Sequence, residues 1–330
     1  MNRRSLLLGT ASVAALGAMA TRPQGAIAQT AVYGIPSDFP TLADAVAALA
    51  DQPAGQVITL VVESGHRPTA GLNLADGDYS RIRITAEDPV VHVHPSFTGH
   101  LMSGTRARLP ILAALFDMEH RGACGMWIDR LSVAAVEPGA GVRNAGDRGL
   151  YVNAGSTAHA DESIFTGSAD RNVWVSRGST LDAERANFSD SGGQNAVYVS
   201  RASRAHLESA VITGAANNGI VATRSWIDCS GADVSGAGQY GLLAERGGHL
   251  CADQSTAVGC GISGVYAEDG SFIQAKYVTA TDSGSGVDIV VVRGSTVHAH
   301  GATTTNGVLA TADYSVAALN TWTPDGAVFG

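Results

Sequence analysis

The chain has 330 residues, of which 40 are glycine and only 21 are lysine or arginine, and its formal net charge at pH 7 is −9. The negative charge argues against nucleic acid as a partner, and binding to an acidic polymer would need a local basic strip. The abundant glycine favours many tight turns over solvated helices.

The first 28 residues predict an export signal. Arg3 and Arg4 precede an uncharged apolar run over 6–20, and the small residues 26–28 form a cleavage site. The pattern resembles a twin-arginine signal, with the general secretory route as the alternative because Asn2 departs from the usual residue. The run is short for a membrane span. We therefore expect a periplasmic or secreted protein with no stable membrane anchor.

The next segment predicts a short helix and a strand. Residues 41–49 have helical spacing, with Thr41 as the N-cap and Asp44 three residues later, as in a capping box. Residues 57–62 are apolar and predict a buried strand. We expect residues 29–65 to form an N-terminal capping helix and first strand, which would cover the open end of a repeat domain over 66–330.

A repeat is the main signal in the rest of the chain. From residue 147 to 316 a small turn residue recurs every 22 to 24 positions, at Ser156, Ser179, Ser203, Ser225, Gly248, Ser271 and Ser295. A short apolar strand precedes each of these residues, and a strand with strict alternation follows it. Such a repeat cannot bury its own thin core, so neighbouring coils must stack. The sequence predicts an all-β fold, a right-handed parallel β-helix.

The second strand of each coil assigns its side chains to two faces. Residues two positions after the small turn residue are apolar and should face inward: Ala158, Leu181, Ala205, Ile227, Leu250, Ile273 and Val297. Polar residues alternate with them and should face water, including His159, Asp182, His206, Asp228 and Cys251. A fixed 22-residue offset would instead place Cys251 over Cys229, with a bulge near Gly248.

The order of these segments resembles the pectate-lyase-like superfamily of parallel β-helices, which includes polysaccharide lyases, glycoside hydrolases and phage tailspike-like proteins. The likeness lies in the run from Ser37 to Ala45, in strand 58–63 and in the segment 81–86, and as architecture it covers residues 32–316. It implies a polymeric carbohydrate as the substrate class. It carries over no catalytic residue, because no family's full catalytic motif is matched.

Acidic and histidine side chains stack on the second strands of three consecutive coils. Glu184 and Glu208 are the candidate acid and base, with Asp182 and His206 beside them. Column mates on adjacent coils lie about 5 Å apart, and the pair Asp182 and Glu184 about 6.5 to 7 Å, so the geometry permits hydrolysis without selecting its stereochemistry. Such a stack could also bind a hard cation such as Ca²⁺. The alternative is a solvated polar face.

Arginines and aromatic residues form two further rows. Arg177 and Arg201 precede the turn, as do Arg224, Arg246 and Arg293; they could bind carboxylates or sulfates of a polymer, or pair with nearby glutamates. The five are not all in the same register relative to the small turn residue. Outward-facing Tyr151, Trp174 and Tyr198 could stack on sugars, anchor a subunit interface or lie under a loop.

Histidines and cysteines give no assigned metal site. The pairs His92 with His94 and His298 with His300 lack an identified third ligand. The four cysteines leave open one disulfide, Cys251 with Cys260 or Cys229 with Cys251, or buried thiols.

The sequence favours an exported carbohydrate-active β-helix that binds a polysaccharide and depolymerises it as a lyase or glycoside hydrolase. Its candidate catalytic residues are Asp182, Glu184, His206, Glu208, Arg177 and Arg201. Its candidate substrate-binding residues are Tyr151, Trp174 and Tyr198, which we expect beside the acidic residues on the same face. The alternative is a non-enzymatic surface adhesin or tailspike-like attachment protein, for which a homotrimer is one compatible assembly.

Overall fold

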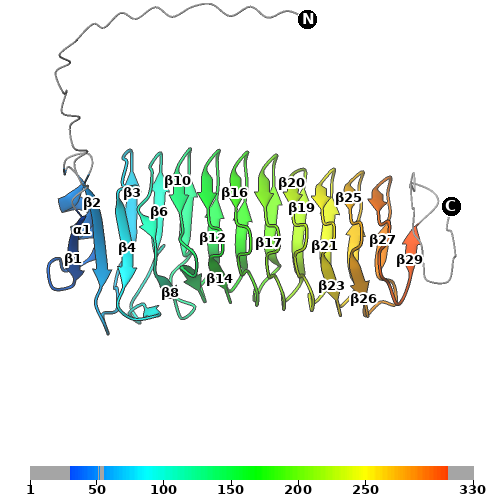
Figure 1. Cartoon of the computed structure of the whole chain (residues 1–330), viewed down its shortest axis with the longest axis horizontal. Helices are drawn as coiled ribbons and strands as arrows, with labels where there is room; N and C mark the ends of the chain where they lie inside the picture. The colour runs from blue at the N-terminus through cyan, green and yellow to red at the C-terminus, as the bar shows by residue number, and fades with distance from the viewer. Residues whose placement is uncertain (1–29, 51, 53–55, 311–330) are drawn as a thin grey trace, which may run out of the picture.

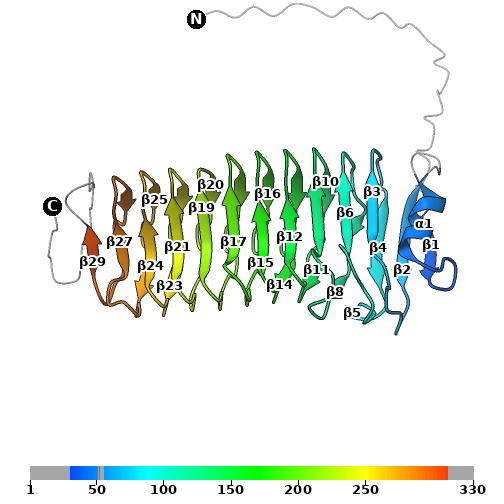
Figure 2. The ribbon, with the colours of Figure 1, turned by 180° about the vertical axis from the view of Figure 1, so that it is seen from behind.

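The computed structural model describes residues 30–50, 52 and 56–310. The predicted export signal and the last residues of the predicted repeat lie outside this range. The described chain forms a rod in which parallel strands of successive coils stack side by side, with the single helix at the end nearest the N-terminus (Figures 1 and 2). The predicted all-β parallel β-helix is confirmed.

The short helix forms where the spacing of residues 41–49 predicts it. Helix α1 (Leu42–Leu49) is capped by Thr41, whose hydroxyl accepts a hydrogen bond from the backbone N–H of Asp44 at 3.1 Å. The helix buries Leu42, Ala45, Val46 and Leu49. Beside it, sheet A contains β1 (Thr30–Ile35), β2 (Val57–Val62), β4 (Ile82–Ala86) and β7 (Ile111–Leu112), so the predicted strand 57–62 has its predicted bounds.

Each regular coil then contributes a strand to sheet B and, after a tight turn, a strand to sheet C. Sheet B has eleven parallel strands: β3 (Leu72–Ala75), β6 (Met102–Thr105), β9 (Met126–Asp129), β12 (Arg148–Val152), β15 (Arg171–Val175), β17 (Asn195–Ser200), β19 (Asn218–Thr223), β21 (Tyr240–Glu245), β24 (Ser263–Ala267), β27 (Ile289–Val291) and β29 (Val308–Ala310). Sheet C has eight: β10 (Val133–Ala135), β13 (Thr157–His159), β16 (Thr180–Asp182), β18 (Arg204–His206), β20 (Trp226–Asp228), β22 (His249–Cys251), β25 (Phe272–Gln274) and β28 (Thr296–His298).

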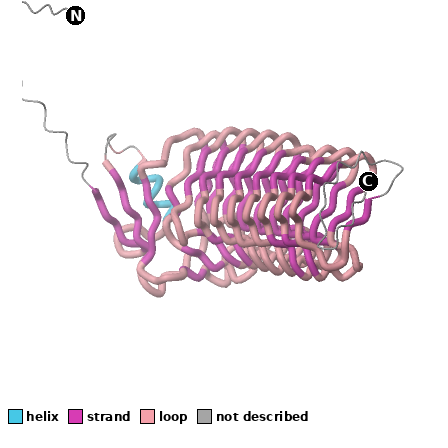
Figure 3. The backbone as a smooth tube through the Cα atoms, turned by 45° about the vertical axis from the view of Figure 1, so that its right-hand side comes forward, coloured by secondary structure: helices cyan, strands magenta, loops and turns pink. Residues whose placement is uncertain are grey.

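A third side, sheet D, closes each coil with short strands. It contains β5 (Val91–His92), β8 (Leu115–Asp117), β11 (Gly141–Arg143) and β14 (Ile164–Thr166), and further along the rod β23 (Thr256–Val258) pairs with β26 (Thr279–Thr281). Single-residue bridges through Asn187, Val211 and Asp233 join the two groups. The repeated coils are visible as evenly stacked loops in Figure 3. Segment 125–133 belongs to this stack through β9 and β10.

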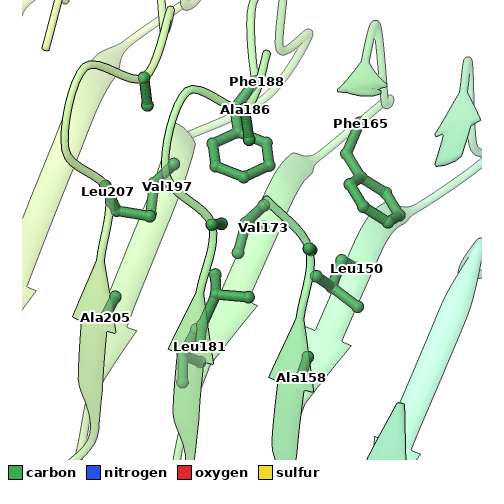
Figure 4. Close-up of a cluster of buried hydrophobic side chains, with 14 of the residues drawn as sticks. Leu150, Ala158, Phe165, Val173, Leu181, Ala186, Phe188, Val197, Ala205 and Leu207 are labelled. Carbon is green, nitrogen blue, oxygen red and sulfur yellow. The ribbon is translucent and has the colours of Figure 1, made fainter. Parts of the chain in front are cut away.

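The core is a set of columns that run along the rod. The predicted inward positions of sheet C, from Ala158 to Val297, are all at most 1% exposed. Leu181 stacks between Ala158 and Ala205 and points into the interior (Figure 4). Large aromatic residues such as Phe165 and Phe188 fill the space near sheet D (Figure 4). Alternation therefore assigned the buried face of these strands correctly.

The small turn residue has a specific role in joining the coils. The backbone N–H of Ser156 donates to Oγ of Ser179 at 3.3 Å, and Ser179 donates in the same way to Ser203 at 3.3 Å. The same link joins Ser203 to Ser225, and it continues from Gly248 to Ser271 at 3.1 Å. These hydroxyls are buried, and those of Ser179, Ser203 and Ser225 satisfy amides of the turn, whereas the amide of Gly248 also donates to the carbonyl of Glu245 at 3.0 Å.

The register around Gly248 follows the alignment on the small turn residue. Asp228 pairs with Cys251, and Ile227 pairs with Leu250. Cys251 therefore does not stack over Cys229, and the fixed 22-residue alternative is wrong. All four cysteines are free thiols, and burial raises the pKa of the Cys124 thiol to about 12.

Candidate functional site

The predicted site residues lie on two different sheets. Tyr151, Trp174 and Tyr198 lie on sheet B, whereas Asp182 and His206 lie on sheet C. The turn at Arg177 and Gly178, where both residues have positive φ, bends the chain between the two sheets. The aromatic column and the acidic column therefore occupy separate faces of the rod, so the expectation of one shared face is wrong. The roles assigned to the individual residues stay predictions.

The acidic residues lie on an open polar surface. Asp182 forms an ion pair with His159 at 3.0 Å, and Glu184 forms one with Arg185 at 3.4 Å. The ring of His206 packs edge-on against Trp226, with centroids 5.1 Å apart. Glu184 and Glu208 lie just past the sheet C strands, at the turn toward sheet D, and Glu208 is exposed. No group of three or more His, Cys, Asp or Glu residues in the described part of the chain could hold a metal ion.

The aromatic column of sheet B is continuous over four coils. Trp127, Tyr151, Trp174 and Tyr198 occupy equivalent outward positions, and consecutive ring centroids lie 4.9, 4.7 and 5.9 Å apart. Tyr151 is only 6% exposed because its neighbours cover both sides of its ring. Trp174 and Tyr198 are more open, so they offer the ring surface that a ligand could contact.

Two arginines stack on this column. The guanidinium of Arg148 lies 4.6 Å from the ring centre of Trp174, and that of Arg171 lies 5.1 Å from Trp174 and 5.3 Å from Tyr198. Each arginine stands three residues before the aromatic residue of its own coil, on the same strand. Sequence reasoning missed both, as well as Trp127, although this repeated spacing of three was a usable signal.

A hollow of about 380 Å³ opens beside this column on the outer face of sheet B. Val221 and Leu243, which follow Tyr198 in the column, form the apolar floor of the hollow. The surface is hollowed there because these two side chains are smaller than the rings of Tyr198 and Tyr266 on either side. Amides, an arginine and a carboxylate surround this apolar floor. The hollow is lined by Arg171, Gln194, Asn195, Tyr198, Asn217, Asn218, Val221, Leu243 and Glu245.

Hydrogen bonds orient the polar groups of the hollow. Asn218 Nδ2 donates to Asn195 Oδ1 at 2.8 Å, and the hydroxyl of Thr223 donates to Glu245 Oε1 at 2.6 Å. Arg171 donates to Gln194 Oε1, while its Nε is buried without a hydrogen-bond partner among the described residues. Fixed amides beside an aromatic ring can bind hydroxyl groups on one side of a ligand and stack on its apolar side.

A carboxylate on the next coil has a shifted pKa. Glu268 follows Glu245 in the same outward row of sheet B, and burial, with the charge of Asp269, raises its pKa despite its ion pair with Arg293 at 2.9 Å. A raised pKa lets a carboxyl group hold a proton closer to neutral pH, as a general acid must. This shift could not be predicted from the sequence, because it depends on burial.

The arginines before the turn form one row, contrary to the expectation of unequal registers. Backbone N–H groups of Gly155, Gly178 and Ala202 donate to the carbonyls of Arg177, Arg201 and Arg224 on the next coil. An alignment on the small turn residue shifts Arg224 by one position, because the turn that follows Arg224 is one residue shorter than the turn after Arg201. Arg246 comes next in the row, since Thr223 pairs with Glu245 directly before it.

The comparisons with known proteins give little beyond the fold. No family model matches the chain, and no curated protein matches it. Among solved structures, the A-module of the mannuronan C-5 epimerase AlgE6 from Azotobacter vinelandii is similar at 12% identity and a TM-score of 0.28, over 84% of this chain and 93% of that chain. Similarity at this level gives no ground for transferring an activity.

Proposed function

We propose that the protein binds a polysaccharide chain along the outer face of sheet B. The observation that carries this proposal is the hollow itself, in which the Tyr198 ring lies beside Arg171 and a set of amides. Sugars present both apolar ring faces and hydroxyl groups, so a site for them needs aromatic surface and oriented hydrogen-bonding groups together.

The arrangement suits a polymer more than a single sugar. The aromatic column runs along the rod, and adjacent coils repeat roughly every 4.8 Å, so a linear chain could contact several coils at once. Each added contact between one polymer and one rigid surface raises the effective affinity. We further propose, from residues 1–28, that the protein acts in the periplasm or outside the cell. Among the described residues, no helix is long and apolar enough to span a membrane.

Alanine at both Trp174 and Tyr198 is expected to weaken polysaccharide binding at least about tenfold, on the scale of the roughly 1–3 kcal/mol that an aromatic ring contributes when a nucleobase stacks on it. Binding would be measured by affinity electrophoresis against a panel of neutral and uronic-acid polysaccharides, with and without calcium. Trp226→Ala is the matched control, since Trp226 is a partly exposed tryptophan on sheet C. Equal losses in both variants would contradict a site on sheet B.

Cleavage of the polysaccharides is measured in the same samples as reducing ends and as absorbance of unsaturated products. Reducing ends with new absorbance from unsaturated products indicate a lyase, and reducing ends alone indicate a hydrolase. Binding without either product favours the attachment protein that the sequence left as the alternative.

The predicted acid and base, Glu184 and Glu208, have a separate test. Changing both to glutamine is expected to leave Tm nearly unchanged, because exposed charges contribute little to stability. Binding to sheet B should also be unchanged, whereas cleavage that depends on this pair would be lost. Full cleavage by a folded double variant would remove both residues from the catalytic candidates.

A further inference from the structure

Four consecutive coils present an exposed arginine at the same position of the turn between sheets B and C. We call Arg177, Arg201, Arg224 and Arg246 the arginine ladder. All four are exposed, and none forms an ion pair with a carboxylate of the described residues. Arg106 and Arg293 lie further along the same row and do form such pairs, with Asp76 and Glu268. The ladder is therefore the part of the row that forms no ion pair within the described chain, although Arg246 lies close enough to Glu268 to act on its charge.

The backbone of the turn does not explain the choice of arginine. The four residues have φ between 48° and 58°, a region in which glycine, asparagine and aspartate are favoured. The turn that returns the chain from sheet D to sheet B has the same positive φ, and there the favoured residues are found: Gly167, Asp190, Gly214, Gly236, Gly259 and Asp282. The backbone therefore does not require arginine at the first turn, although other residues adopt the same positive φ, such as Ala154 in the same row and Glu162, Arg185 and Gln254 at the turn between sheets C and D.

The surroundings of the ladder leave its charge largely uncompensated. The outward residues that precede it on sheet B are neutral over three coils, at Ser176, Ser200 and Thr223. Because adjacent coils repeat roughly every 4.8 Å, neighbouring guanidinium groups repel one another, and a row of anions would relieve that repulsion. In a protein with a net charge of −9, the ladder is the local basic strip that binding to an acidic polymer requires.

We propose that the arginine ladder binds the carboxylate or sulfate groups of a linear anionic polysaccharide that lies along the rod. This rests on the proposed function and adds the chemical class of the polymer. Guanidinium groups form paired hydrogen bonds with both kinds of oxyanion. The ladder also adjoins the hollow, because Glu245, which lines the hollow, directly precedes Arg246. One polymer can therefore place its sugar rings over sheet B and its acidic groups along the ladder.

The test changes Arg177, Arg201 and Arg224 to asparagine, a residue that tolerates positive φ, so the fold should be retained. The matched control changes Arg67, Arg121 and Arg185 to asparagine, because these arginines are also partly or fully exposed, and each pairs with a glutamate. Circular dichroism and Tm check that both variants are folded. The probes are polygalacturonate for carboxylates, dextran sulfate for sulfates and dextran as the neutral polymer, each titrated at increasing NaCl concentration.

The wild type is expected to bind one acidic polymer with an affinity that falls as salt rises, and the preferred polymer identifies the anion. The ladder variant should bind it about tenfold more weakly, while the control stays within about twofold. Equal binding by the ladder variant and the wild type would overturn the proposal, as would binding of neutral dextran alone. After either outcome, the proposed function would still stand if alanine at Trp174 and Tyr198 abolished binding of the polymer that the wild type binds. Wild-type protein that binds none of the three polymers would overturn both.

Discussion

Leu181→Asp is expected to yield no soluble folded protein. Leu181 is fully buried in the middle of β16, between Ala158 and Ala205 on the adjacent coils. An aspartate there would bury a charge with no partner, which costs several kcal/mol in addition to about 2 kcal/mol of lost apolar burial. A typical domain has only about 5–15 kcal/mol of stability, so one such change is enough to unfold it.

The measurement is the yield of soluble protein, followed by circular dichroism and thermal melting. Asp182→Ala is the matched control, because it changes the next residue of the same strand on the outer face, where Asp182 pairs with His159. The control should melt within a few degrees of the wild type, since exposed ion pairs contribute about 0–1 kcal/mol. A folded Leu181→Asp protein with wild-type melting would contradict the register of sheet C.

Asp288→Ala is expected to unfold the last described coil while most of the rod stays folded. The Asp288 residue is fully buried, and its carboxylate accepts hydrogen bonds from the backbone N–H groups of Ser283, Thr305 and Asn306 at 3.1, 2.8 and 2.6 Å. Alanine would leave these amides without a partner, at a cost of about 1–3 kcal/mol for each one that stays buried. Because coils contact only their neighbours, the damage should be confined to this end.

Acid should have the same effect on the wild type. Burial alone would raise the pKa of Asp288, but the hydrogen bonds from Asn306, Ser283 and Thr305 outweigh it and hold the pKa below its usual value. A lowered pKa means that the ionised carboxylate stabilises the fold. This contribution is complete above the unfolded-state pKa of about 3.9 and is lost as the pH falls below it.

Hydrogen exchange of the amides of Ser283, Thr305 and Asn306 measures this local stability at pH 7. Asp282→Asn is the control, because Asp282 is exposed and asparagine tolerates its positive φ. Equal protection of these amides in Asp288→Ala and the wild type would show that the carboxylate does not hold the coil.

The sequence was sufficient to predict the fold because its strongest signals are local and repeated. Strict alternation on the second strand assigned Leu181 to the core and Asp182 to the surface, and both assignments hold. Thr41 and Asp44 predicted the start of α1. The small turn residue also gave the correct register at Gly248, because its hydroxyl or its small size is required by hydrogen bonds between coils.

The candidate site was harder to predict because it depends on which sheet each residue lies on and on the sizes of side chains stacked on neighbouring coils. The positive φ of Arg177 and Gly178 directs sheets B and C to different sides, so Trp174 and Asp182 do not share a surface. Alignment on the small turn residue also placed Arg224 one position away from Arg201, although both directly follow residues that pair in sheet B. The hollow arises because the two residues after Tyr198 in the column, Val221 and Leu243, are smaller than tyrosine, and that pattern becomes informative only once the strand register is known.

The most direct test of the central claim is a crystal structure of the protein with an oligosaccharide derived from the polymer that it binds best. Sugar density on sheet B, with a ring against Tyr198 and hydrogen bonds to Arg171 or the amides of the hollow, is the result that the proposed function predicts. Oligosaccharide bound instead on sheet C, beside Asp182 and His206, would contradict it and would return the site to the acidic column.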